Sequence, residues 1–132
     1  MNKTRKLDIV NVLERALASY KQELKIPLTK FIFQTPLHWN VVTIVALATF
    51  KDDYTTSFQD LCRQIPSQVG SKSSIQNIIE DAIQKNYFKK TPLPSDKRIK
   101  ALTLTDTAKR DYERWLYLDA GQYFPDNLKS PF

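Results

Sequence analysis

Apolar residues recur at three- and four-residue steps along the first part of the chain, the spacing of helices that bury one face. Residues 8–24 carry one such stripe, with lysine and glutamate on the other face. Its members are Ile9, Leu13, Ala16, Leu17, Tyr20 and Leu24. Residues 35–50 are apolar most of the way round, which predicts a buried central helix. Thr35 is expected to cap that helix and Pro36 to occupy its first position.

Two shorter segments flank the central helix. Residues 25–34 are expected to be an irregular connector, because Pro27 interrupts them. Residues 56–65 predict a short helix, since Thr56 and Gln59 match a capping box. The two residues before this helix favour a short strand.

Residues 71–87 predict another amphipathic helix, separated from the short one by a tight turn at residues 67–70. Its apolar stripe is rich in isoleucine and comprises Ile75, Ile78, Ile79, Ala82, Ile83 and Tyr87. Two helices joined by a tight turn are typical of a helix-turn-helix motif.

The pattern then changes to the period of two that indicates strands. Residues 87–93 and 99–105 are joined by a short polar loop, so they are expected to pair as a hairpin. A last helix begins at residues 105–106 and includes Ala108, Tyr112, Trp115 and Leu116. The fold class predicted is mainly α with a small β-hairpin wing, a winged helix-turn-helix.

Composition narrows the function without naming it. The chain has 132 residues, 42% of them hydrophobic, enough for one domain with a real core. No apolar run approaches the roughly 18 residues that span a bilayer, so no membrane partner is expected. Cys62 is the single cysteine; it excludes an internal disulfide or a zinc cluster and favours the cytoplasm. Because Cys62 falls on an apolar helix face, we expect an inert buried thiol.

The charge is unevenly placed along the chain. Twenty basic residues against 14 acidic ones give a formal charge of +6, which suggests a polyanionic partner. Between Lys89 and Lys100 the basic residues are Lys89, Lys90, Lys97, Arg98 and Lys100, against Asp96 alone. Much of the excess charge is therefore expected on the hairpin.

Several segments resemble the MarR family of bacterial winged-helix regulators, over about residues 35–116. Residues 60–65 resemble the family's "DLA..L" supporting helix, and residues 71–75 with 85–88 its "SRSTV…L..KGLV" recognition helix and exit. Asp96-Lys97-Arg98 followed by residues 102–105 resembles the wing signature "DxR…L.LT..G". The chain departs from the family at Ala108 and Asn86, where glycine is usual. Asn86 is a mild exchange, because asparagine tolerates the left-handed conformation.

The resemblance implies a domain plan and a partner. Residues 1–34 would form a dimerisation helix and connector, residues 35–105 the winged-helix DNA-binding domain, and residues 106–132 a C-terminal helix and tail that complete the dimer. The stripe from Ile9 to Tyr20 and the aromatic residues Tyr112, Trp115 and Tyr117 are expected to supply the apolar surface of this homodimer. Double-stranded DNA is the expected partner.

The resemblance also assigns candidate DNA contacts. The recognition helix, residues 71–87, would enter the major groove, and the wing, residues 92–100, the minor groove. The expected contacts are Lys72, Ser73, Ser74, Gln76, Asn77, Asp96, Lys97, Arg98 and Lys100. Glu80 and Asp81 lie one turn further along and would repel phosphate, so either the helix tilts out of the groove there or an acid pairs with a nearby base.

A small-molecule site is a further expectation from the resemblance. Tyr20, Phe33, His38 and Trp39 would line a crevice for a small aromatic effector, although each also suits the core. His38, the single histidine, reads equally as a structural residue.

Two other functional classes are weighed against DNA binding. A winged helix can serve as a protein–protein adaptor, but the basic wing with Ser73, Ser74 and Asn77 favours nucleic acid. An enzyme would need a nucleophile, metal or phosphate-loop constellation, and the sequence offers none, so no cofactor is expected.

Overall fold

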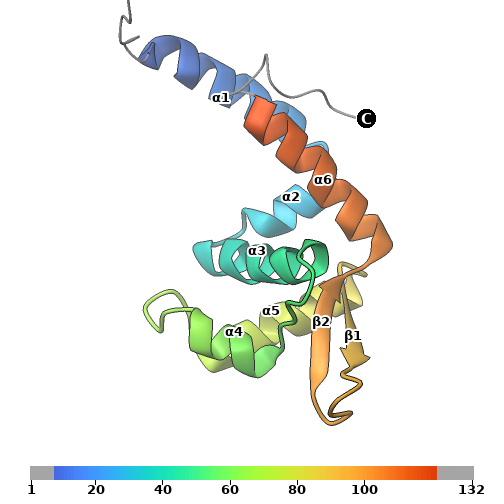
Figure 1. The fold of residues 1–132 in the computed structure, drawn as a ribbon. Coiled ribbons are helices and arrows are strands. Elements are labelled where there is room, and N and C mark those ends of the chain that lie inside the picture. Colours follow the sequence, from blue (N-terminus) through green and yellow to red (C-terminus); the bar gives the residue numbers. More distant parts are fainter. Residues whose placement is uncertain (1–7, 122–132) are drawn as a thin grey trace, which may run out of the picture.

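The computed structural model describes residues 8–121 and contains six helices and one hairpin. In chain order they are α1 (Ile9–Glu23), α2 (Pro27–Ile32), α3 (Pro36–Phe50), α4 (Phe58–Gln64), α5 (Lys72–Gln84), β1 (Phe88–Pro92), β2 (Lys100–Leu104) and α6 (Asp106–Gly121). Figure 1 shows α3, α4, α5 and the hairpin gathered in one lobe, from which α1 and the far part of α6 project side by side as an arm. The predicted winged helix-turn-helix is confirmed.

The helix starts follow from capping side chains. Thr35 accepts a hydrogen bond from the His38 N–H (3.2 Å) and Pro36 takes the first position of α3, as predicted. In α4 the capping box is displaced by one residue from the prediction. Ser57, not Thr56, accepts from the Asp60 N–H, and the Asp60 carboxylate returns a bond to the Ser57 N–H (3.1 Å).

The connector predicted at residues 25–34 is wrong over most of its length, because residues 27–32 form α2. Pro27 begins this helix instead of breaking a structure, since proline suits the first helical turn, where its missing N–H has no partner to lose. Leu28, Phe31 and Ile32 are buried, so α2 is held by the core. The buried Thr29 hydroxyl adds a bond to the Glu23 carbonyl (2.6 Å) at the end of α1.

The hairpin is antiparallel, with its register running from Phe88 opposite Leu104 to Pro92 opposite Lys100. Two bonds fix it to the helices: the Leu104 N–H donates to Thr49 Oγ1 of α3 (2.9 Å), and the Leu102 N–H donates to the Thr56 carbonyl (2.8 Å). The short strand predicted at residues 54–55 is not present, and the single bond at Thr56 is what joins that segment to β2.

The core lies between α3, α5, the hairpin and α6. Val41, Val42 and Val45 of α3 are fully covered, as are Ile75 and Ile79 of α5. Cys62 is partly buried and packs against this core.

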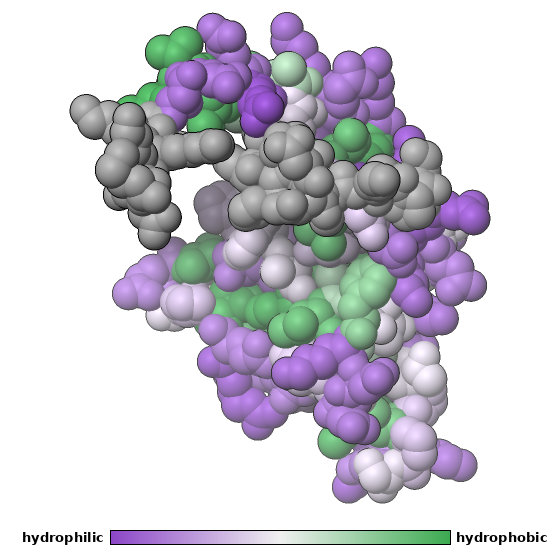
Figure 2. Space-filling model, turned by 45° about the horizontal axis from the view of Figure 1, so that its top comes forward, coloured by the Kyte–Doolittle hydropathy of each residue, from purple (hydrophilic) through white to green (hydrophobic). Residues whose placement is uncertain are grey.

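The prediction that α3 is buried most of the way round is only partly right. Trp39, Leu47 and Phe50 remain between 42% and 49% exposed on its outer side. Figure 2 shows apolar surface at the α1 end of the molecule and in a band across its middle. One face of α3 therefore meets no other part of the described chain.

The exit of α5 is sharper than predicted. The helix ends at Gln84 with Lys85 as its cap, because Asn86 adopts the left-handed conformation (φ 63°) expected for its position. Thr105 then joins this exit to α6: its N–H donates to the Tyr87 carbonyl (2.9 Å) and its hydroxyl to the Asn86 carbonyl (2.7 Å).

The arm is held together by a buried polar group. Glu23, at the end of α1, is 2% exposed and accepts hydrogen bonds from the Trp115 indole N–H of α6 and from the Ser19 hydroxyl (3.0 Å). Tyr112 and Trp115 are 6% and 5% exposed, so they are core residues and not the spare dimer surface predicted for them. Their rings pack against each other and against Phe50 and Phe33, which α1 and α6 alone do not supply.

Candidate nucleic-acid interface

The start of α5 presents short polar side chains to solvent. Ser71 caps the helix by accepting from the Ser74 N–H (3.2 Å), and the hydroxyls of Ser73 and Ser74 lie 3.2 and 3.0 Å from the Ser71 hydroxyl. Ser73 and Asn77 are exposed, as is Lys72, whereas Ser74 is partly buried and bonded within the cap. Ser73 and Asn77 are therefore the predicted base contacts with the greatest freedom to meet a ligand.

The second half of α5 carries its acids in local pairs. The Gln76 amide donates to Glu80 (3.1 Å), and Lys85 Nζ lies 2.9 Å from Asp81. Of the two alternatives for these acids, pairing with a base is present for Asp81. Gln76 is thus partly occupied by Glu80, which lowers its availability for a base edge.

The wing tip is organised by Asp96 and Arg98. The Asp96 carboxylate accepts from Arg98 Nε (3.1 Å), Nη2 (3.2 Å) and the backbone N–H (3.0 Å). These bonds lower the pKa of Asp96, so the pair stays ionised at neutral pH. The Arg98 side chain is nevertheless 91% exposed, so its orientation is set while its guanidinium remains accessible.

The basic residues of the hairpin surround a shallow hollow between the wing and the helices. The hollow is about 220 Å³ in volume, and Lys90, Arg98 and Lys100 line its hairpin side. Gln59 of α4 and Gln76 of α5 line its opposite side. Gln59 and Lys90 were missed as site residues, because no sequence pattern indicates that α4 and β1 face the same space.

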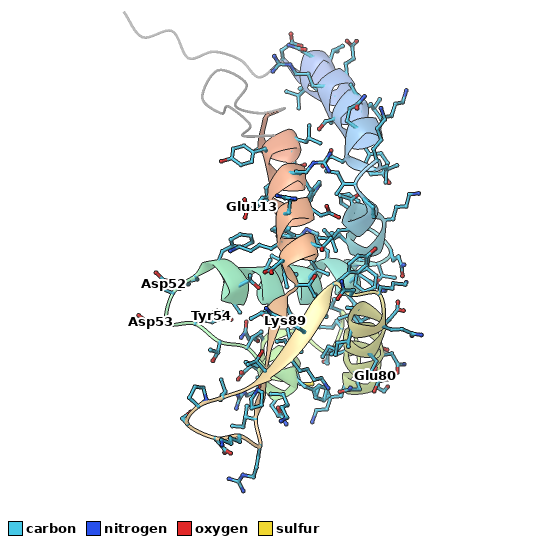
Figure 3. The ribbon with its side chains drawn as sticks, turned by 90° about the vertical axis from the view of Figure 1, so that its right-hand side faces the viewer. Asp52, Asp53, Tyr54, Glu80, Lys89 and Glu113 are labelled. Atoms are coloured by element: carbon cyan, nitrogen blue, oxygen red, sulfur yellow. The ribbon has the colours of Figure 1, made fainter. Side chains whose placement is uncertain are left out.

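The acidic loop after α3 lies away from this surface. Figure 3 shows Asp52 and Asp53 at the end of α3, on the opposite side of the view from Glu80 of α5, with Lys89 of β1 between them. Asp52 and Asp53 are exposed, and Asp53 adopts a left-handed turn (φ 59°). The positive charge is therefore gathered on the wing and the negative charge on a different loop.

The predicted aromatic crevice is not assembled within one chain. Tyr20 and Phe33 pack together, with ring centroids 5.6 Å apart, and Phe33 also meets Trp115. His38 instead packs edge-on against Phe31 (5.0 Å) and lies 2.7 Å from the Thr35 hydroxyl. Burial lowers the pKa of His38, consistent with its structural reading. Trp39 is 46% exposed and joins neither group.

Two other classes of site were sought in the described part of the chain. Residues 8–121 contain no cluster of three or more histidine, cysteine or acidic residues that could hold a metal ion. Over the same residues, no helix has both the length and the apolarity to cross a bilayer.

Comparison with known proteins identifies the fold. No protein-family model matches the sequence, and no curated protein matches it significantly. The structure of NadR in complex with 4-hydroxyphenylacetate matches with a TM-score of 0.54 at 19% identity, over 95% of this chain and 82% of that one. A mutant of MarR from E. coli matches with a TM-score of 0.50 at 15% identity, over 98% and 89%. The chain has the winged-helix fold of MarR.

A third structure with the MarR fold contains DNA. The transcriptional repressor CouR, bound to a 23-mer DNA duplex, matches with a TM-score of 0.51 at 16% identity, over 93% of this chain and 84% of that one. The resemblance noted from the wing and supporting helix is thus confirmed for the fold. Within the MarR fold, that resemblance assigns α5 to the recognition helix and the β1–β2 hairpin to the wing.

Proposed function

We propose that this chain is a cytoplasmic DNA-binding transcription regulator that acts as a homodimer. The observation that carries the proposal is the pairing of an exposed polar helix start with a basic, ordered wing. Ser73 and Asn77 are open to solvent on α5, and Arg98 is oriented by Asp96 without being covered. The coincidence of both elements in a MarR fold favours nucleic acid over a protein partner.

The start of α5 suits the major groove. A helix-turn-helix places the first turns of its second helix against base edges. Asn77 offers the two-point pairing that adenine accepts, and Ser73 can bond to any base. Lys72 and the free N–H groups of the first turn would meet a phosphate. Glu80 and Asp81, one turn later, would lie outside the groove.

The wing suits the adjacent minor groove. An A·T-rich minor groove is narrow and strongly negative, which attracts arginine. Arg98 reaches such a groove without first being ordered, because Asp96 already holds it. Lys97 and Lys100 would bind phosphates on either side and release counterions.

A homodimer would place two such surfaces on one site. The apolar side chains of α1 have no cover within the described chain: Leu13 is 58% exposed and Leu17 67%. A second chain would cover them, and two-fold symmetry would set half-sites about 10 bp apart, or a multiple of that. A small aromatic effector is part of the proposal, since NadR, which shares the fold, was solved with 4-hydroxyphenylacetate.

The test begins with selection of a duplex from a random DNA pool by the purified protein. Binding of the selected duplex and of a scrambled one is then measured across a salt series for wild type, Asn77→Ala and Lys97→Ala. Losing a base contact should cost about 1–3 kcal/mol on the selected duplex and little on the scrambled one. Losing a phosphate contact should weaken both and lower the salt slope by about one unit.

The outcomes separate the proposal from its rival. If Asn77→Ala weakens both duplexes equally, the assignment of α5 to the major groove is wrong. Asp52→Ala, in the loop away from the wing, is the control and should leave specificity and the identity of the selected site unchanged. If no sequence is enriched and none of the variants alters DNA binding, the chain is a protein–protein adaptor.

A further inference from the structure

The helix that sequence reasoning missed builds a hollow of its own. About 290 Å³ of space lies between α2 and the exit of α5, on a different part of the surface from the DNA-contacting residues. The residues used below are Lys25, Lys30, Phe31, Gln34, Lys85 and Tyr87, which we call the α2 hollow. None of them belongs to the crevice predicted around Phe33 and Trp39.

The floor of the α2 hollow is aromatic and fixed. The rings of Phe31 and Tyr87 lie 5.3 Å apart at an angle of 56°. Phe31 is 2% exposed and is held from another side by the edge of His38, at 5.0 Å. A planar molecule would therefore meet a surface that does not need to be ordered first, which reduces the entropic cost of binding.

The rim of the hollow is cationic. Lys85 is paired with Asp81 at 2.9 Å and lies 5.3 Å from the centre of the Phe31 ring. Lys25 and Lys30 are exposed and form no ion pair with any residue of the described chain. Two amines at one edge of an aromatic floor thus lack an anion, and the Gln34 amide supplies a further hydrogen-bonding group beside them.

We propose that the α2 hollow binds a small aromatic carboxylate. The ring would pack on Phe31 and Tyr87, and the carboxylate would accept hydrogen bonds from Lys25 and Lys30. The volume stands near the lower end of the range for ligand pockets, about 300 Å³, which suits a single ring and excludes larger cofactors. The ligand would bridge α2 to Tyr87, next to the left-handed turn that ends α5.

The consequence for DNA rests on the proposed function, whereas the binding itself does not. Tyr87 accepts the Thr105 N–H and so connects the exit of α5 to α6. A ligand fixed between α2 and Tyr87 would restrict the motion of α5 relative to the arm. Ligand binding is therefore measured without DNA, so that its failure and the failure of DNA binding are separate results.

The experiment titrates the full chain with three probes and follows backbone amide signals by NMR. Benzoate has both a ring and a charge, benzamide has the ring alone, and cyclohexanecarboxylate has the charge alone. Benzoate should produce saturable shifts centred on residues 25–34 and 85–87, with at least about fivefold weaker binding for each of the other probes. Lys30→Gln should weaken benzoate about five- to tenfold, the loss expected for one exposed charge-assisted hydrogen bond.

Lys21→Gln is the matched control, because it removes the same charge from an exposed position of α1 outside the hollow. It should leave the benzoate affinity unchanged, and Lys25→Gln should repeat the effect of Lys30→Gln. The proposal is overturned if benzoate gives no saturable shift, if the shifts centre elsewhere, or if benzamide binds as tightly. Equal losses in Lys21→Gln and Lys30→Gln would also overturn it, since they indicate attraction by net charge.

Discussion

Gly70 lies in the turn between α4 and α5, where its missing side chain leaves room for Leu37 of α3. A Cβ built on Gly70 would lie 2.3 Å from Leu37 Cδ2 and 2.8 Å from Cδ1, far inside normal contact. Leu37 is 5% exposed, so it has little space into which to move. The helix-turn-helix thus approaches α3 closely because this position lacks a side chain.

Gly70→Ala should therefore destabilise the protein by about 1–3 kcal/mol, the usual cost of forcing extra volume into a packed core. Urea denaturation followed by circular dichroism measures the change. Gly121→Ala is the control, because a Cβ there meets no atom within 4 Å. Equal stabilities of Gly70→Ala and wild type would contradict the close contact.

At the residue scale, the sequence predicted side chains whose surroundings are local. The Asp96–Arg98 pair and the left-handed Asn86 were expected, because each depends on neighbours a few residues away. The partial engagement of Ser74 and Gln76 was not expected. Their availability depends on which hydroxyl or amide they meet in the folded helix, and a helical wheel places only directions.

Among the elements, α1 has the most exposed apolar side chains. Ile9, Val10, Leu13 and Leu17 are between 58% and 67% exposed, although their spacing is that of a buried stripe. Burying a leucine side chain contributes about 1.5–3 kcal/mol, so two chains gain by covering these residues mutually. The α1 helix is thus the element on which the proposed dimer depends.

Leu13→Glu combined with Leu17→Glu should convert the protein to a monomer, because the added charges would be desolvated in the interface. Light scattering after gel filtration should show the mass fall by half. Ala18→Glu with Gln22→Glu adds the same charge to exposed positions on another face of α1 and should leave the mass unchanged. A wild-type protein that is already monomeric would refute the dimer.

Element positions could be predicted where periodicity is long, and less well where one residue type has two meanings. The stripes of α1, α3 and α5 and the alternation of the hairpin gave the right order of elements. Pro27 was taken as a break, although proline also begins helices. Thr56 and Ser57 both fit a cap, and the choice was decided by burial of Thr56 against β2, which the sequence does not display.

For the molecule as a whole, Glu23 joins the arm to the lobe. It is buried between Trp115 and Ser19, and its carbonyl accepts the Thr29 hydroxyl of α2. Burial raises the pKa of Glu23 above its ordinary value of 4.5, and the negative charge of Asp119 on α6 acts in the same direction. The folded state therefore binds this proton more tightly than the unfolded state.

A raised acid pKa stabilises the fold at low pH, and this contribution is lost as pH rises through the folded value. Glu23→Gln keeps an oxygen acceptor for Trp115 but cannot ionise. Its melting temperature relative to wild type should therefore increase as pH rises from about 4.5 towards 7. Thermal melts of both proteins at several pH values measure this difference.

Glu14→Gln removes a carboxylate from an exposed position of α1 and controls for the change in net charge. A Glu23→Gln difference that stays constant with pH, or that matches the Glu14→Gln difference, would show that burial of Glu23 does not affect its ionisation.

Thr105 gives the molecule a mechanical property. Its bonds to Asn86 and Tyr87, together with its hydroxyl accepting the Ala108 N–H at the start of α6 (3.2 Å), connect α5, the wing strand and α6 at one residue. A tilt of α6 must then carry the reading surface with it, as a lever carries its tip. In the proposed dimer, the arms would set the distance between the two reading surfaces. Two chains with the same α5 and wing but different arms would therefore prefer operators of different half-site spacing.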